Sequence, residues 1–280
     1  MVFGFLARQG VAGGGWARRY LRIRKDVYAV QWMTPDRFPC IPVGLFDFST
    51  HDDYVDACRV HQRDHDGWRL SDDGVIGGFS QSKAKIVLDG QEDESREADG
   101  SSETLDNLQF EKVANKETEQ DFLPFLRWNG VLDTQVGLQS DARRSGFCSL
   151  RSPEFPFDGA NLRGLYQGVE LLCRTDGRRY TINLKVSTSV PDDIYQGIVH
   201  IEPSEEFQQI VLPFDRFRLT SRGREREYGR QLDDRVAIES IGFTLMDGQD
   251  GEFCFDLARI RAVNLFEGSI FEKPPKDNYE

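Results

Sequence analysis

Short runs of strictly alternating apolar and polar residues dominate the second half of this chain. In the run Tyr180 to Val186 every second residue is apolar, and the same period of two recurs in 241–245 and 253–257. Successive side chains of a strand point to opposite faces, so this period indicates antiparallel strands with one buried face. Such strands need a second sheet over the buried face. The pattern therefore predicts a β-sandwich.

The composition fits this prediction and narrows the range of partners. The 280 residues include 20 Phe but only 3 Met, which suits strands better than long helices. The formal net charge of -12 disfavours nucleic acid and anionic membrane as partners. No stretch approaches the roughly 18 to 20 apolar residues that a membrane-spanning helix needs. Any approach to a membrane is therefore expected to be peripheral, through protein contacts.

The chemistry-bearing residues do not form a recognisable catalytic or metal-binding set. The five cysteines are widely spaced without a C-x-x-C pair, which disfavours zinc and redox motifs and fits a reducing compartment. Cys58, His61 and His65 would share one face of a predicted helix, but a fourth metal ligand is lacking. Asp192 and Asp193 are adjacent, so they cannot face each other across a cleft as glycosidase acids do. We expect no enzyme activity, no metal and no cofactor.

The chain divides into regions of different composition. The first region has six basic and no acidic residues, which is typical of an organelle transit peptide; an uncleaved arm that docks on an acidic partner is the alternative. A later region has twelve acidic residues against three basic ones and is expected to stay largely disordered, or to serve as a tethered partner site. The predicted regions are a basic N-terminal segment 1–25, an extended and helical arm 26–65, a β-sandwich domain 66–265 with the acidic insertion 89–121, and a C-terminal tail 266–280.

Several short sequence strings, taken in order, resemble the complex I intermediate-associated protein 30 family. The resemblance covers about Asp66 to Asn264, apart from the acidic insertion. The strings are SDDGVIGGFS (71–80, after Trp68), SGFCSLRS (145–152), RTDGRRYTINL (174–184), Tyr195, LPFDRF (212–217), RGR (222–224) and IGFTLMDGQDGEFCFDLARIRA (241–262).

The resemblance implies a galactose-binding-like jelly-roll sandwich that is imported into mitochondria. It further implies an assembly factor for the membrane arm of NADH:ubiquinone oxidoreductase, respiratory complex I. On this basis we expect a chaperone-like binding protein on the matrix side of the inner membrane, in contact with complex I membrane-arm subunits and other assembly factors. An acidic sandwich would complement the Lys- and Arg-rich loops that membrane proteins keep on the non-translocated side.

The candidate contacts lie in turns and charged loops. The glycines after Ser71 lack the Lys-Ser/Thr pair of a phosphate-binding loop and are expected to permit a tight turn. Arginines in the TSRGREREYGR segment could bind partner carboxylates or carbonyls, although a solvated loop is the simpler and favoured interpretation. The predicted partner-binding residues are Gly74, Gly77, Gly78, Arg178, Arg179, Arg222 and Arg224.

Two alternative functions remain open. The chain could be a permanent accessory subunit of complex I. It could also be a carbohydrate-binding module, for which Trp68 or Trp128 would have to be exposed and stack on a sugar ring. We expect both tryptophans to lie in the core.

Overall fold

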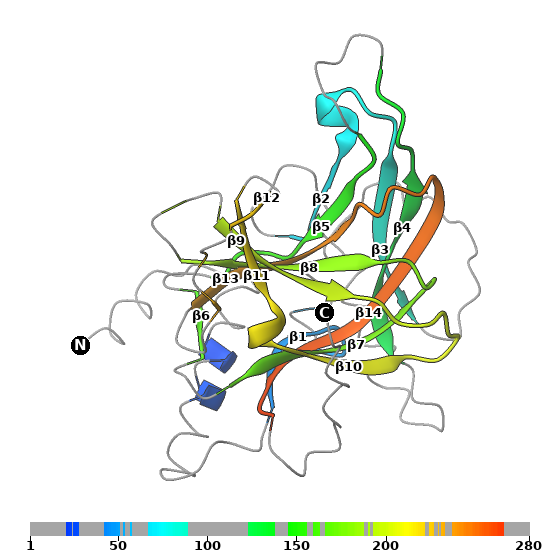
Figure 1. Cartoon of the computed structure of the whole chain (residues 1–280). Coiled ribbons are helices and arrows are strands. Elements are labelled where there is room, and N and C mark those ends of the chain that lie inside the picture. The colour runs from blue at the N-terminus through cyan, green and yellow to red at the C-terminus, as the bar shows by residue number, and fades with distance from the viewer. Residues whose placement is uncertain are drawn as a thin grey trace, which may run out of the picture.

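The computed structural model of this chain contains two packed antiparallel sheets (Figure 1). The structure describes residues 21–23, 25–27, 42–50, 53, 57, 67–88, 123–137, 145–155, 159–162, 166–187, 190, 193–221, 224–226, 229, 231–232 and 237–265.

The smaller sheet has six strands, and β14 is central to it. Its order is β10 (Gln208–Pro213), β7 (Gly168–Thr175), β14 (Gly251–Val263), β4 (Pro124–Leu132) and β3 (Gln81–Leu88), with β1 (Val43–Asp47) also paired to β14. The first half of β14 pairs with β4, and its second half pairs with β1 on the same edge. Along its other edge, β14 pairs with β7.

The larger sheet has eight strands. Its order is β12 (Arg224–Glu225), β11 (Arg218–Ser221), β9 (Asp193–Val199), β8 (Tyr180–Val186), β13 (Ala237–Leu245), β5 (Cys148–Arg151) and β2 (Arg69–Asp72), with β6 (Ala160–Asn161) also paired to β13. Two 3-10 helices, η1 (Asp73–Ile76) and η2 (Phe214–Arg216), follow β2 and β10.

The predicted all-β sandwich is confirmed, and all strand pairs in both sheets are antiparallel. The chain passes repeatedly between the layers. It leaves the smaller sheet after β7, forms β8 and β9 in the larger, returns for β10, and crosses again to β11. Such crossing connections are the jelly-roll arrangement that the sequence led us to expect.

The alternating residues bury the faces that their period predicted. Tyr180, Ile182 and Leu184 are fully buried, as are the apolar positions of 241–245, and those of 253–257 are nearly so. Aromatic rings join the two layers at the centre of the core, where Phe255 lies 4.9 Å from Tyr180 between ring centroids. Each buried aromatic ring removes a large apolar area from water, which favours the packed sandwich.

The described residues before residue 66 include a strand and core residues of the sandwich, whereas the sequence predicted an extended and helical arm there. β1 is a strand of the smaller sheet, and Leu45, Phe46 and Phe48 are fully buried. Residues 21–23, 25–27, 53 and 57 are helical. Ile23 and Val27 reach the same core. Among the described helical residues, no helix is long and apolar enough to cross a membrane.

Candidate partner-binding site

The predicted glycine-rich turn forms around a 3-10 helix at the edge of the larger sheet. Asp72 caps η1 through its side chain, which accepts a hydrogen bond from Gly74 N at 3.1 Å. Gly77 follows the helix in the left-handed region, with φ of 83°, which favours glycine. At Gly78 a Cβ would lie 2.1 Å from Ser145 Oγ, so only glycine permits this close approach.

A buried carboxylate fixes this turn to the segment that leads into β5. Asp73 is fully buried, and its Oδ2 accepts hydrogen bonds from the Ser145 hydroxyl and the Gly146 amide, both at 2.6 Å. Its Oδ1 accepts one from Ser80 N at 2.9 Å. Burial alone would raise the pKa of Asp73, but the hydrogen bonds from Ser145, Gly146 and Ser80 outweigh it and lower the pKa. Asp73 therefore holds two distant segments together as an anion.

The turn exposes three large apolar side chains to solvent. Val75 is 78% exposed, Phe79 54% and Ile76 39%. We call these three residues the apolar tip. Large exposed apolar side chains that gather within five residues are typical of a contact surface, whereas single ones are common on any protein. The predicted contact glycines thus position side chains that could meet a partner.

Arg178, another predicted contact, faces the protein instead. Its guanidinium forms a two-point ion pair with Asp247, at 2.7 and 2.9 Å. It also donates to the carbonyls of Gly251 and Glu252 at 3.2 and 3.1 Å, and only 11% of its side chain is exposed. Burial would raise the pKa of Asp247, but the hydrogen bond and positive charge of Arg178, together with backbone hydrogen bonds that include the Gln249 amide, outweigh it and lower the pKa. Arg178 therefore stabilises the turn between β13 and β14.

The remaining predicted contacts lie on other elements than the glycine-rich turn or outside the described residues. Arg179 is exposed at the start of β8, and Arg224 is exposed in β12 at the opposite edge of the larger sheet. Arg222 lies outside the described residues, and so do Cys58, His61 and His65. The acidic insertion and the C-terminal tail also lie outside them.

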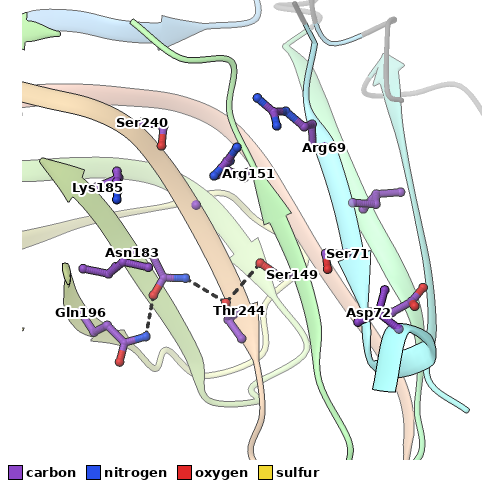
Figure 2. Close-up of a pocket in the computed structure, with 14 residues that line it drawn as sticks. Arg69, Ser71, Asp72, Ser149, Arg151, Asn183, Lys185, Gln196, Ser240 and Thr244 are labelled. Atoms are coloured by element: carbon purple, nitrogen blue, oxygen red, sulfur yellow. Dashed lines mark hydrogen bonds between the residues drawn. The ribbon is translucent and has the colours of Figure 1, made fainter. Parts of the chain in front are cut away.

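A groove of about 630 Å³ lies on the outer face of the larger sheet, next to the glycine-rich turn (Figure 2). Its floor is the outward face of β13, where Ser240, Gly242 and Thr244 follow one another at every second position. These residues are small, whereas the neighbouring strands carry longer side chains. The floor is therefore lower than its two sides, and the groove runs along β13.

A chain of amide and hydroxyl groups that hydrogen-bond to one another crosses the groove. Gln196 Nε2 donates to Asn183 Oδ1 at 2.7 Å, and Asn183 Nδ2 donates to Thr244 Oγ1 at 2.8 Å. The Thr244 hydroxyl in turn donates to Ser149 Oγ at 3.3 Å. This polar ladder crosses β9, β8, β13 and β5, and Figure 2 shows it as a chain of dashed lines.

One side of the groove carries two arginines on neighbouring strands. Arg69 of β2 and Arg151 of β5 are directly paired in the sheet, and both line the groove. Glu154 lies within 3.5 Å of Arg69 and 3.3 Å of Arg151, but 53% of its side chain is exposed. Burial, followed by the adjacent Arg69 charge, lowers the pKa of Arg151, and Glu154 opposes this only in part. Lys185 lines the groove from β8.

The sequence strings that carry the family resemblance meet at this groove. Asp72 comes from the first string, Arg151 from the second, Asn183 from the third and Gly242 from the last. The sequence prediction included the glycine-rich turn but missed the groove residues. Their outward positions were readable from the alternation. Which strands lie side by side was not.

The structure also bears on the sugar-binding alternative. Trp68 and Trp128 are both fully buried, as expected, so neither can offer a flat ring to a sugar. None of the described residues that line the groove is aromatic. In the described part of the chain, no three His, Cys, Asp or Glu residues gather closely enough to hold a metal ion.

Fold and groove together define an antiparallel β-sandwich protein with a polar groove on the outer face of one sheet. Comparison of the sequence with family models identifies the family. The model for complex I intermediate-associated protein 30 matches residues 58–257. The chain therefore belongs to the complex I intermediate-associated protein 30 family.

Curated relatives carry the same family name at modest identity. The mouse (Mus musculus) protein named "Complex I intermediate-associated protein 30, mitochondrial" is 28% identical over 140 residues, covering 46% of this chain and 41% of that protein. A Neurospora crassa protein of the same name is 24% identical over 152 residues, covering 51% and 53%. The chain thus spans about half the length of the curated relatives it matches.

Solved structures with a similar arrangement of strands include carbohydrate-binding modules. A family 11 module of the cellulosomal cellulase Lic26A-Cel5E of Clostridium thermocellum has 16% identity and a TM-score of 0.37, covering 72% of this chain and 98% of that chain. A family 30 module has 11% identity and a TM-score of 0.33, covering 56% and 76%. Similarity at this level carries no ligand over to the present protein.

Proposed function

We propose that this protein binds mitochondrial complex I while the complex is being assembled. The observation that carries the proposal is the family match over residues 58–257, together with relatives named for their association with complex I intermediates. The proposed site of action is the matrix side of the inner membrane. The proposed partners are membrane-arm subunits and other assembly factors.

The proposed mode of action is binding without catalysis. The groove presents cations, amides and hydroxyls, which are suited to holding a polypeptide in place. The charge of -12 supports attraction to the basic loops of membrane-arm subunits. The apolar tip supplies the apolar contact that a protein interface needs at its centre. Together these features support a chaperone-like role.

The proposal is tested by recovering tagged protein from mitochondria. Native gels with mass spectrometry of co-migrating proteins should place it with incomplete membrane-arm assemblies. Recovery in equal amounts with complete, active complex I would instead identify a permanent accessory subunit. Recovery without any complex I subunit would refute both functions.

A pair of variants makes this experiment specific to the apolar tip. Replacing Val75 and Phe79 by Ser should lower recovery of complex I subunits, because it removes exposed apolar area without changing the core. Ile198→Ser is the matched control, since Ile198 is 49% exposed on β9, away from the tip. Equal recovery with all variants would exclude the tip as the contact, although not the function.

A further inference from the structure

The apolar tip lies at one end of the molecule, on a turn that is anchored to two other segments. Figure 1 shows its helix, η1, as the short cyan coil near the upper end of the ribbon. The bridge between Gly78 and Val136 joins the turn to the segment after β4, and the buried Asp73 joins it to the segment before β5. The Phe79 ring lies along the first of these segments, because a Cβ added to Gly137 would meet its Cζ at 3.8 Å. The tip is therefore pre-organised for a contact.

The fold gains little from the apolar side chains at the tip. Val75 is 78% exposed and Phe79 54%, so most of each side chain is in water and not in the core. Side chains on an anchored turn lose little conformational entropy when a partner covers them. Such a partner would gain the hydrophobic free energy of both side chains.

Three carboxylates lie around the tip, and we call Asp72, Asp133 and Asp250 the acidic rim. Asp72 is at the start of η1 (Figure 2). Asp133 is beside the tip, since its backbone N–H donates to the hydroxyl of Ser80 at 3.0 Å. Asp250 reaches the same segment from the turn between β13 and β14 and accepts a hydrogen bond from the Thr134 amide at 2.7 Å. All three carboxylates are thus on or next to the turn that carries the tip.

The acidic rim is bound by backbone amides and keeps its charge. Asp72 accepts such a hydrogen bond at 3.1 Å and Asp133 at 2.8 Å. Within the residues that the structure describes, no Lys or Arg side chain forms an ion pair with the acidic rim. Asp247, in the same turn as Asp250, is by contrast neutralised by Arg178. The tip is therefore an apolar surface with a negative border.

This combination indicates the chemistry of the occupant. An apolar centre with a border of carboxylates complements apolar side chains that are flanked by Lys or Arg. A second copy of this chain fits poorly, because two tips in contact would bring two acidic rims together. An anionic membrane surface fits poorly for the same reason.

We propose that the apolar tip binds a partner segment in which large apolar residues are flanked by Lys or Arg. The apolar side chains of the segment lie on Val75 and Phe79, and its cations lie at the acidic rim. The inference deepens the proposed function, on which it rests in taking the occupant to be a polypeptide. Its test uses purified components, so it can fail while the association with complex I stands, and the reverse.

The test is fluorescence anisotropy with the full chain and three short labelled peptides. The first peptide places Leu between Lys residues, the second replaces its Leu by Ser, and the third replaces its Lys by Glu. The net charge of -12 attracts both Lys peptides, so the difference between them measures the apolar contact. We expect the Lys–Leu peptide to bind about tenfold more tightly than the Lys–Ser peptide, and the Glu–Leu peptide to bind least. Equal binding of the two Lys peptides would overturn the proposal, as would tighter binding of the Glu–Leu peptide.

Two variants and their matched controls locate the contact. The double variant Val75→Ser with Phe79→Ser should weaken the Lys–Leu peptide about tenfold, whereas Ile198→Ser, which removes an exposed apolar side chain of β9, should leave its affinity unchanged. Asp133→Asn keeps an oxygen that can accept the amide hydrogen bond but removes the charge, so it should weaken both Lys peptides about threefold. Asp215→Asn removes the same charge from the exposed side of η2 and should leave both affinities unchanged.

Circular dichroism and thermal melting check that each variant is native. If the double variant fails to fold, the comparison of Asp133→Asn with Asp215→Asn still decides the outcome, and equal affinities in those two variants would contradict the proposal. Equal affinities in the double variant and Ile198→Ser would refute it as well. Flotation with phosphatidylcholine vesicles, with and without an anionic lipid, and analytical ultracentrifugation examine the other occupants. Vesicle binding or self-association that the double variant loses would assign the tip to a membrane or to a second copy, and the proposal would be wrong.

Discussion

The arginines on the outer faces of the two sheets differ in how deeply their carboxylate partners are buried. On the smaller sheet, Arg127 and Arg174 both bind the buried Asp256, at 2.9 and 2.8 Å. Arg261 likewise binds the buried Glu170 at 2.7 Å. On the larger sheet, Arg69 and Arg151 share a carboxylate that is half exposed. The comparison teaches that buried carboxylates hold the arginines of the smaller sheet, whereas the carboxylate that Arg69 and Arg151 share is open to solvent.

Aromatic packing strengthens this contrast. The guanidinium of Arg174 lies between two rings, 4.9 Å from the centroid of Phe125 and 4.7 Å from that of Phe207. Such stacking fixes the arginine and adds cation–π attraction. The described residues that line the groove of the larger sheet include no aromatic ring that could stack on an arginine in this way. On the outer face of the smaller sheet, the arginines are thus held by ion pairs and ring contacts within the protein.

The largest expected effect comes from removing the shared acid of the smaller sheet. Asp256→Ala would remove the buried carboxylate that Arg127 and Arg174 share and should lower the free energy of unfolding by about 3 kcal/mol. Denaturant unfolding followed by circular dichroism measures the change. Glu252→Gln removes an exposed carboxylate from the same strand and should change stability by less than about 0.5 kcal/mol. Similar losses of stability in both variants would show that the ion pairs of Asp256 do not stabilise the outer face of the smaller sheet.

A somewhat smaller loss is expected at the edge of the larger sheet. Asp73→Ala leaves the buried amides of Ser80 and Gly146 without their acceptor and should lower the free energy of unfolding by about 2 kcal/mol. Asp215→Ala is the control, because Asp215 also lies in the first turn of a 3-10 helix but is exposed. Equal stability of the two variants would show that the turn does not depend on its carboxylate.

Acid should weaken the protein through the same carboxylates. The pKa values of Asp73 and Asp247 are lowered in the folded state, so their contribution is complete above the ordinary carboxylate pKa of the unfolded chain. It is lost as the pH falls through the lowered folded values. The free energy of unfolding measured across this acidic range should therefore fall less steeply in Asp73→Asn than in the parent. A parallel fall in both would remove Asp73 from the explanation.

The smallest effect is predicted at the groove itself. Arg151→Gln should change the free energy of unfolding by less than about 0.5 kcal/mol, because one of two adjacent like charges is removed. The same change at Arg174 on the smaller sheet should cost about 1.5 kcal/mol, because it breaks an ion pair and two ring contacts. Thermal melting of the two variants side by side compares the faces directly. A larger loss of stability for Arg151→Gln than for Arg174→Gln would contradict the prediction that the arginine of the smaller sheet contributes more to stability.

The sequence was most informative where one physical rule decides the outcome. A period of two can only bury one face of a strand, and the residues from Tyr180 to Val186 follow that rule throughout. The left-handed conformation at Gly77 was likewise foreseeable from the glycine-rich string. By contrast, Arg178 looked like a surface contact, because nothing in its own segment reveals that Asp247 lies opposite.

The groove could not be predicted, because it depends on the order of strands in space. Ser240, Gly242 and Thr244 are visibly small at alternate positions, but small residues form a trough only when larger ones flank them. The flanking Arg151 and Asn183 come from strands distant in sequence. The pairing of β1 was hidden for the same reason, since its proline- and aromatic-rich surroundings resembled an extended arm.

The pairing of β1 with β14 has a consequence for how the protein is made. Val43 lies opposite Ala262, so one of the first described strands to leave the ribosome must wait for the last. Closing so long a loop is slow, and folding dominated by distant pairings leaves apolar strands open to aggregation meanwhile. Newly synthesised chains should thus stay dependent on cellular holdases until β14 has been synthesised, and a premature stop codon before β14 should yield an insoluble product.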